Sequence, residues 1–326
     1  MSVNKKIYIT RQLPETGINL LKEKFDVEVA QKRPTNQEML IREIADCDAV
    51  VTLLSDKIDE KVLSSAPNLK IVANYAVGYN NIDISAAKKY RIMVTNTPGV
   101  LTNATAEIAF ALLINLTRKI IEADKFTRDG KFIGWDPLLL MGDELKGKTI
   151  GIIGLGRIGQ DMALKCRAFG MNIIYHNRKP ADKKTENALS AKYRQIDELL
   201  ELSDVISIHT PLNQETYHLV NDGAFEKMKH GVYIINTSRG ELIHEEALVR
   251  ALQSGKVKGA GLDVYEFEPK VTKELLSMKN VVLLPHIGSA TIETRSKMSE
   301  MVAKNVIAAL KGKKPANIVP ELASEF

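Results

Sequence analysis

The sequence is poor in cysteine and aromatic residues and has no long apolar run. Its 326 residues include two cysteines, Cys47 and Cys166, which lie far apart, so neither a disulfide framework nor a cysteine-rich metal cluster is expected. The longest apolar run, near Ile108–Leu116, is far short of the roughly 20 residues that a membrane span needs. The N-terminus carries no signal-peptide pattern. We therefore predict a cytoplasmic protein with no membrane partner.

A strong excess of one charge is also missing. The chain has 45 Lys and Arg against 40 Asp and Glu, a formal net charge of +5. Nucleic-acid binding normally needs clustered basic residues, and no part of the chain carries such a cluster, so no nucleic-acid partner is expected. The 44% hydrophobic content is typical of a globular protein with a sizeable core, and the length predicts roughly two domains.

Short β-rich runs alternate with longer amphipathic stretches along the whole chain. This alternation is typical of βαβ units, so we predict the α/β class with two doubly wound parallel-sheet domains. Strands are expected at residues 6–10, 49–53, 70–74, 93–96, 149–153, 172–176, 205–209, 232–236, 259–262 and 281–284. Helices are expected at residues 14–24, 102–119, 158–169, 195–202, 223–228, 245–254 and 291–310, and a loop at 130–147.

A glycine-rich turn follows the expected strand at 149–153 and precedes a helical pattern. Its glycines fit a tight turn, a close approach of the backbone to a pyrophosphate, and helix–strand packing. The N–H groups at the helix start then bind anionic phosphates. The turn predicts a dinucleotide site made by Gly154, Leu155, Gly156, Arg157, Ile158 and Gly159.

The end of the next expected strand bears on which dinucleotide is bound. A site that selects NAD usually has Asp or Glu about 20 residues after the glycine-rich turn. Here Asn177, Arg178 and Lys179 occupy that position instead. A guanidinium binds a 2′-phosphate that a carboxylate would repel. NADP(H) is therefore favoured, with NAD(H) as the alternative. The other interpretation is that both cations are solvated loop residues.

Three polar residues follow predicted strands near the end of the second half of the chain: Arg239, Glu268 and His286. Ligands of open α/β sheets bind at the carboxyl ends of the strands. A carboxylate beside a histidine orients the ring and favours its charged form, which gives a proton donor and acceptor. An arginine offers a planar fork to a substrate carboxylate. Each residue taken alone also fits a purely structural role.

The chain resembles the D-isomer-specific 2-hydroxyacid dehydrogenase family over essentially its whole length, and within it the glyoxylate/hydroxypyruvate reductase branch. The resemblance rests on six motifs in order with matching spacing. These are residues 74–83 (NYAVGYNNID), 154–159, 209–212 (HTPL), 236–240 (NTSRG), 261–264 (GLDV) with Glu268-Pro269, and 284–289 (LPHIGS). It implies Rossmann/flavodoxin-like domains with an interdomain cleft.

The resemblance also implies roles for individual residues. Its catalytic residues fall on Arg239, Glu268 and His286, with His286 as general acid. Its substrate-binding residues fall on Val77, Gly78, Arg239 and Ser289. Beyond the glycine-rich turn and residues 177–179, its cofactor contacts fall on Thr105, Pro211, Thr237 and Asp263. No metal is expected, since no group of His, Cys and carboxylates has metal-site spacing.

The resemblance further implies how the chain is organised. Residues 1–99 with 291–326 are expected to form the substrate-binding domain, and residues 100–290 the dinucleotide-binding domain. Trp135 and Pro137 match a loop that reaches across a homodimer to the partner's active site. An equal alternative is that Trp135 is a hydrophobic anchor for its own loop.

The activity implied is NADPH-dependent reduction of small 2-keto acids, glyoxylate and hydroxypyruvate, to 2-hydroxy acids. Two alternatives stay open from the sequence. One is a D-lactate or D-3-phosphoglycerate dehydrogenase that uses NAD. The other is a non-catalytic, nucleotide-sensing binding module that resembles a corepressor.

Overall fold

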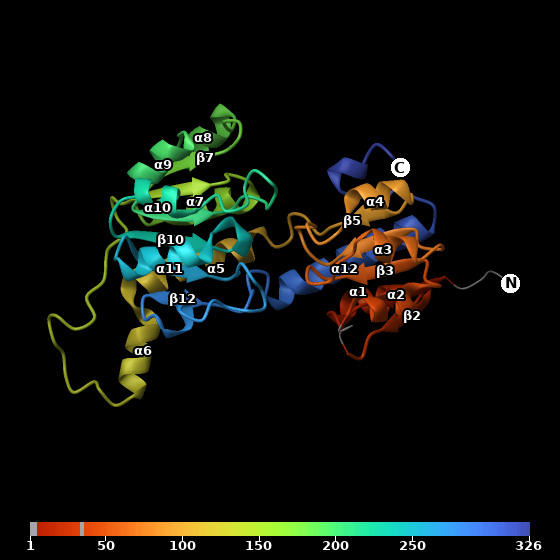
Figure 1. Cartoon of the computed structure of the whole chain (residues 1–326), viewed down its shortest axis with the longest axis horizontal. Helices are drawn as coiled ribbons and strands as arrows, with labels where there is room; N and C mark the ends of the chain where they lie inside the picture. The colour runs from red at the N-terminus through yellow and green to blue at the C-terminus, as the bar shows by residue number, and fades with distance from the viewer. Residues whose placement is uncertain (1–4, 33–35) are drawn as a thin grey trace. The chain divides into compact units, whose positions relative to one another are not determined.

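The computed structural model describes residues 5–32 and 36–326, so the first four residues of the N-terminus considered above lie outside it. The chain divides into two compact units (Figure 1). We call Met1–Leu101 with Ser289–Phe326 the first unit and Thr102–Gly288 the second unit. Each has its own all-parallel sheet, which confirms the predicted doubly wound α/β class. Among the described residues, no helix is long and apolar enough to cross a membrane.

The first unit has a five-stranded sheet in the order β2-β1-β3-β4-β5. Its strands are β1 (Lys6–Ile9), β2 (Asp26–Val29), β3 (Ala49–Thr52), β4 (Ile71–Asn74) and β5 (Met93–Thr95). Its helices are α1 (Glu15–Lys22), α2 (Gln37–Ile44), α3 (Glu60–Ser64), α4 (Ile84–Lys89) and α12 (Ile292–Leu310). Along β1, Tyr8 packs into one apolar cluster while Ile7 and Ile9 pack into another, because successive side chains point to opposite faces.

The second unit has a seven-stranded sheet in the order β12-β11-β10-β9-β6-β7-β8. Its strands are β6 (Thr149–Ile153), β7 (Asn172–His176), β8 (Ala191–Tyr193), β9 (Val205–Ile208), β10 (Val232–Asn236), β11 (Val257–Leu262) and β12 (Val281–Leu283). Its helices are α5 (Thr102–Arg118), α6 (Ile120–Arg128), α7 (Arg157–Ala168), α8 (Lys183–Leu189), α9 (Ile196–Leu202), α10 (Asp222–Lys227) and α11 (Glu245–Gln253). Strand order reverses between β6 and β9, and ligands of such sheets bind at this switch point.

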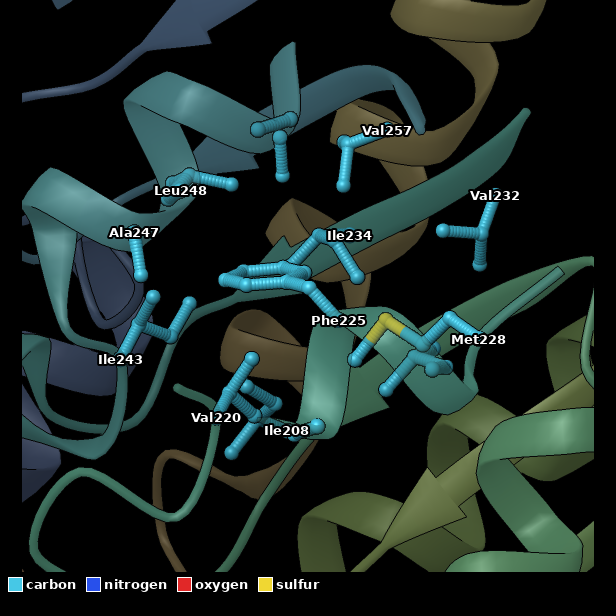
Figure 2. Close-up of a cluster of buried hydrophobic side chains, with 14 of the residues drawn as sticks. Ile208, Val220, Phe225, Met228, Val232, Ile234, Ile243, Ala247, Leu248 and Val257 are labelled. Carbon is cyan, nitrogen blue, oxygen red and sulfur yellow. The ribbon is translucent and has the colours of Figure 1, made fainter. Parts of the chain in front are cut away.

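Apolar clusters cover both faces of the larger sheet. Figure 2 shows one of them, where Phe225 of α10 lies among Ile208 of β9, Ile234 of β10, Leu248 of α11 and Val257 of β11. Tyr233 and Ile235, which flank Ile234 along β10, belong to the cluster on the other face of the sheet. Burial on both faces explains why these strands are nearly continuous apolar runs. The core thereby fixes the strand ends that carry the polar residues described below.

The structure differs from the sequence prediction in a few elements. The expected helix at 102–119 ends at Arg118, since Lys119 has a left-handed backbone (φ 51°), and a second helix, α6, follows. Strands β2 and β8 were not expected. They lie at the edges of their sheets, and in β2 no residue is fully buried, which leaves a weak apolar signal. The last helix is capped by Thr291, whose side chain accepts the Thr294 N–H.

Candidate active site

The glycine-rich turn connects β6 to α7 at the switch point of the second unit. Gly154 has φ +99°, and a Cβ there would lie 2.7 Å from the His209 backbone at the end of the neighbouring strand. Gly156 caps α7 without a side-chain hydrogen bond, and the space around its Cβ position is open. The first N–H groups of α7 therefore lack a side-chain cap, which suits an anionic phosphate.

Residues 177–179 follow β7, beside this turn. The Asn177 side chain accepts the Leu155 N–H at 2.7 Å, so it holds the glycine-rich turn. Arg178 and Lys179 are exposed, and neither makes an ion pair within the part of the chain that the structure describes. Two exposed cations therefore lie at the position where a carboxylate would select NAD.

The other predicted cofactor residues lie on several elements of the second unit. Thr105 is buried in α5, and a Cβ on Gly288 would lie 3.3 Å from its methyl group. Pro211 is exposed in the loop after β9. Thr237 follows β10, and its buried hydroxyl has no hydrogen-bond partner among the described residues. The open glycine-rich turn and this unpartnered hydroxyl fit a dinucleotide, whose polar groups would satisfy both.

His286 and Glu268 form a close pair at the carboxyl edge of the larger sheet. The Nδ1 atom of His286 lies 2.8 Å and 3.1 Å from the two oxygens of Glu268. An ionised carboxylate can only accept, so Nδ1 carries the proton in this bond. The ring's Nε2 makes no hydrogen bond to the protein residues described. The pair thus leaves one ring nitrogen available to a reacting group.

Asp263 holds the backbone on the C-terminal side of this histidine. Its two carboxylate oxygens accept the N–H groups of Ile287 and Gly288, each at 2.7 Å. His286 itself has a left-handed backbone (φ 55°), a conformation that costs energy for a non-glycine residue. Burial raises the pKa of Asp263, although the two N–H bonds and His286 oppose this effect. The predicted contact of Asp263 with a cofactor stays a prediction.

Arg239 lies in a tight turn after β10. The side chain of the buried Asn236 shapes this turn, since its Nδ2 donates to the Arg239 carbonyl at 2.8 Å and its Oδ1 accepts the Ser238 N–H at 3.0 Å. Burial lowers the pKa of Arg239 from its ordinary value, while the charges of Glu241 and Glu268 act in the opposite direction. Arg239 is thus half-buried, and its guanidinium lies close enough to Glu268 for the two charges to interact.

Gly240 explains how the arginine turn approaches the segment that carries Glu268. A Cβ on Gly240 would lie 1.8 Å from the carbonyl carbon of Tyr265, so no other residue fits there without moving the backbone. The structure therefore brings the three predicted catalytic residues, Arg239, Glu268 and His286, to one edge of the second unit.

Sequence reasoning missed a polar network beside Glu268. The N–H groups of Glu245 and Glu266 donate to each other's carboxylates at 2.8 Å, so α11 is bonded reciprocally to the segment after β11. His218 also belongs to this network, since its Nε2 lies 2.7 Å from a carboxylate oxygen of Glu266. The only available signal was acidic residues at the start of a helix, which is too common to identify such a network.

Three of the predicted substrate-binding residues, Val77, Gly78 and Ser289, belong to the first unit. Val77 and Gly78 are half-buried in the loop that follows β4. Ser289 is half-buried just before α12.

The loop at 130–147 is irregular, as its composition predicted, and extends with α6 away from the rest of the second unit (Figure 1). Trp135 is 85% exposed, so its ring does not anchor the loop within its own chain. Five further apolar residues of the loop are exposed: Phe132, Ile133, Leu138, Leu139 and Met141.

No metal centre is found in the described parts of the chain. No three His, Cys, Asp or Glu side chains there are grouped as metal ligands. Cys47 and Cys166 are free and buried, and burial raises the pKa of Cys166 to about 12. Neither cysteine therefore has the thiolate character of a reactive residue.

Comparison with known proteins defines the class to which this geometry belongs. A family profile described as "D-isomer specific 2-hydroxyacid dehydrogenase, NAD binding domain" matches residues 110–288. The glyoxylate reductase of Thermococcus litoralis is 49% identical over 321 residues, 96% of each chain. That of Pyrococcus furiosus is 47% identical over 319 residues, 96% of this chain and 95% of that one.

Solved structures give the same result. A glyoxylate reductase structure from "Paecilomyes thermophila" has a TM-score of 0.88 at 35% identity and covers 98% of this chain and 99% of that chain. An NADPH-dependent glyoxylate/hydroxypyruvate reductase from Sinorhizobium meliloti, in complex with NADP and malonate, has a TM-score of 0.89 at 33% identity and covers 98% of each.

Fold and site together define an oxidoreductase that uses a nicotinamide dinucleotide. The chain belongs to the D-isomer-specific 2-hydroxyacid dehydrogenase family, in its glyoxylate reductase branch. It is an NAD(P)-dependent D-2-hydroxyacid dehydrogenase, and the predicted family, fold and enzyme class are confirmed.

Proposed function

We propose that this enzyme reduces glyoxylate and hydroxypyruvate to the corresponding 2-hydroxy acids with NADPH. The pairing of His286 with Glu268, at the sheet edge that also holds Arg239, is the observation that carries the proposal. The names of the relatives support the choice of substrates. The second unit is then the dinucleotide-binding domain, and the first unit is the substrate-binding domain.

Three residues of the second unit, Arg239, His286 and Glu268, have separate roles in the proposed reduction. When bound, the reduced nicotinamide supplies the hydride that adds to the keto carbon. Arg239 binds the substrate carboxylate with its planar fork and stabilises negative charge that develops on the keto oxygen. His286 donates the Nε2 proton to that oxygen, which becomes the hydroxyl group. Glu268 holds Nδ1 and balances the positive charge of the protonated ring.

Further substrate contacts are assigned to Val77, Gly78 and Ser289 of the first unit. Val77 and Gly78 offer backbone N–H groups to the carboxylate, and Ser289 offers its hydroxyl. All three are half-buried, so each keeps some access to a ligand.

The preference for NADPH rests on the residues after β7. Arg178 and Lys179 are exposed cations without ion-pair partners among the described residues, and a 2′-phosphate gives them an anion to bind. Asn177 is neutral and holds Leu155, so it presents no carboxylate to repel that phosphate. The remaining cofactor contacts assigned here are Gly154, Leu155, Gly156, Arg157, Ile158, Gly159, Thr105, Pro211, Thr237 and Asp263.

A substrate panel with both cofactors tests the proposed function. We expect glyoxylate and hydroxypyruvate to be reduced with higher kcat/KM than pyruvate or phosphohydroxypyruvate, and NADPH to be preferred over NADH. The measurement is the loss of reduced-nicotinamide absorbance under initial-rate conditions. Turnover of pyruvate alone, or no turnover of any keto acid, would contradict the proposal.

The same assay on Arg178→Ala separates cofactor choice from substrate choice. We expect KM for NADPH to rise about tenfold, since a charge-assisted hydrogen bond to the phosphate is lost, while KM for NADH hardly changes. Lys184→Ala is the matched control, because Lys184 is an exposed cation on the neighbouring α8. A wild-type preference for NADH would show that the assignment of Arg178 and Lys179 is wrong.

We further propose that two copies of the chain form a homodimer through α6 and the loop at 130–147. Ile133 is 98% and Trp135 85% exposed, and α6 adds exposed Ile120 and Ile121. Contiguous exposed apolar residues usually mark an interaction surface. Trp135 then contacts the partner rather than its own chain.

Sedimentation equilibrium tests the homodimer. We expect wild type to have twice the 36.2 kDa mass of the chain, and the double variant Ile133→Asp/Trp135→Asp to have the single mass, because two charges enter an apolar interface. Leu276→Asp is the control, since Leu276 is 64% exposed outside this loop. A wild-type protein that is monomeric at micromolar concentration would disprove the assignment.

A further inference from the structure

The loop after β4 is held from one side by two asparagine amides. Asn96, directly after β5, donates from Nδ2 to the Val77 carbonyl at 2.7 Å. Asn74, the last residue of β4, donates from Nδ2 to the Gly78 carbonyl at 2.9 Å. Asn74 is fully buried, and its Oδ1 accepts the Thr52 hydroxyl at 3.1 Å, so its amide has a fixed orientation. Two successive carbonyl groups are thus bonded to side chains at the ends of adjacent strands.

A third carbonyl of the same loop is held by the backbone. The Ala76 carbonyl accepts the N–H of Thr97 at 2.9 Å, and Thr97 directly follows Asn96. The carbonyls of residues 76, 77 and 78 are therefore all bonded, which fixes three consecutive peptide planes.

Because each trans peptide is planar, a bonded carbonyl also fixes the direction of the N–H group in the same plane. In each peptide plane the N–H of the next residue points away from the carbonyl. The bonded carbonyls therefore direct the N–H groups of Val77, Gly78 and Tyr79 away from Thr97, Asn96 and Asn74 respectively. None of these three N–H groups donates to a protein acceptor in residues 5–32 and 36–326. Val77, Gly78 and Tyr79 are half-buried residues, and consecutive backbone N–H groups that lack a protein acceptor can together bind an anion.

We infer that Asn74 and Asn96 are positioning residues, which orient the N–H groups of Tyr79 and Gly78 respectively toward the substrate carboxylate, beside the Val77 N–H that the Thr97 bond directs. The inference rests on the proposed function, because that assigns the carboxylate to this loop, and it adds Tyr79 N–H as a third donor. Neither asparagine needs to touch the substrate. Asn96 acts through the peptide that joins Val77 to Gly78, and Asn74 through the next one.

Two substitutions of Asn96 test the inference, since Asn96 is half-buried and tolerates change better than the buried Asn74. Asn96→Ala removes the donor, and Asn96→Asp replaces it with a carboxylate that repels the Val77 carbonyl. We expect KM for glyoxylate at saturating NADPH to rise about tenfold in both, with kcat changed much less, because the lost contact serves ground state and transition state alike. The Kd of NADPH, measured by fluorescence, should not change.

A second measurement keeps the test independent of turnover. Calorimetric binding of oxalate to the NADP-loaded protein reports carboxylate binding directly, and we expect it to weaken by the same factor in both variants. Asn172→Ala is the matched control, since its Nδ2 also donates to a backbone carbonyl, that of Gly147 at 3.0 Å, on an exposed surface. Circular dichroism confirms that each variant is folded.

The outcomes separate the inference from the function on which it rests. If wild type reduces glyoxylate and the Asn96 variants keep its KM and oxalate affinity, the positioning role is wrong. If wild type reduces no keto acid and does not bind oxalate, the proposed function is wrong. A fall in kcat with unchanged KM and unchanged oxalate affinity also contradicts the inference.

Discussion

His286→Gln is expected to lower kcat for keto-acid reduction by about 10²–10⁴-fold, the usual contribution of a general acid. Glutamine keeps polar volume and a hydrogen-bond donor near Glu268 but has no proton to give at neutral pH. The Kd of NADPH should stay unchanged, because in our proposal the His286 ring acts on the substrate oxygen and does not bind the cofactor. Single-turnover absorbance and cofactor fluorescence measure the two quantities separately.

His230→Gln is the matched control for this experiment. His230 is an exposed histidine of the second unit, and we expect its replacement to leave kcat unaffected. If His286→Gln retains turnover close to that of wild type, the acid role belongs to another group, and the pair with Glu268 is structural.

Glu268→Gln divides the role of the pair into orientation and charge. The amide oxygen still accepts the Nδ1–H that the carboxylate accepts at 2.8 Å, but the negative charge is lost. The protonated ring then loses its counter-charge, so kcat for reduction should fall although the ring keeps its orientation. A variant with wild-type kcat would assign Glu268 to orientation alone.

The parts of the site that could be predicted are those encoded locally. The turn from Gly154 to Gly159 lies within one strand–turn–helix unit, so its spacing alone indicates its structure. Arg239 and His286 follow buried strands, and the carboxyl ends of parallel strands share one edge, so their proximity follows from the sheet. Only the alternation of strands and helices was needed to expect that sheet.

The parts that could not be predicted depend on contacts between distant segments. Asp263 accepts two N–H groups more than twenty residues further along the chain, and Gly240 is required by the backbone at Tyr265. No local pattern encodes either contact. Lys119 adopts a left-handed backbone although lysine is a good helix former, so residue propensity does not indicate where α5 ends.

Arg239→Lys is expected to lower kcat/KM for glyoxylate by about 10²–10³-fold, the effect of losing one preorganised donor at a developing oxyanion. Lysine keeps the positive charge but loses the planar fork, so it cannot serve carboxylate and keto oxygen together. The turn itself should survive, because Asn236 holds it through backbone atoms of Ser238 and Arg239. Steady-state kinetics on both keto acids measure the loss.

Arg250→Lys controls for the loss of a bidentate arginine as such, since Arg250 forms such a pair with Asp222 on an exposed surface at 2.8–3.1 Å. We expect that variant to keep wild-type kcat/KM. Added guanidinium should restore part of the activity of Arg239→Ala, because Gly240 and Asn236 keep the shape of the turn around the vacated side chain. Rescue by guanidinium but not by ammonium would show that activity needs the planar donor geometry of Arg239. Equal rescue by both cations would show that only its positive charge is needed.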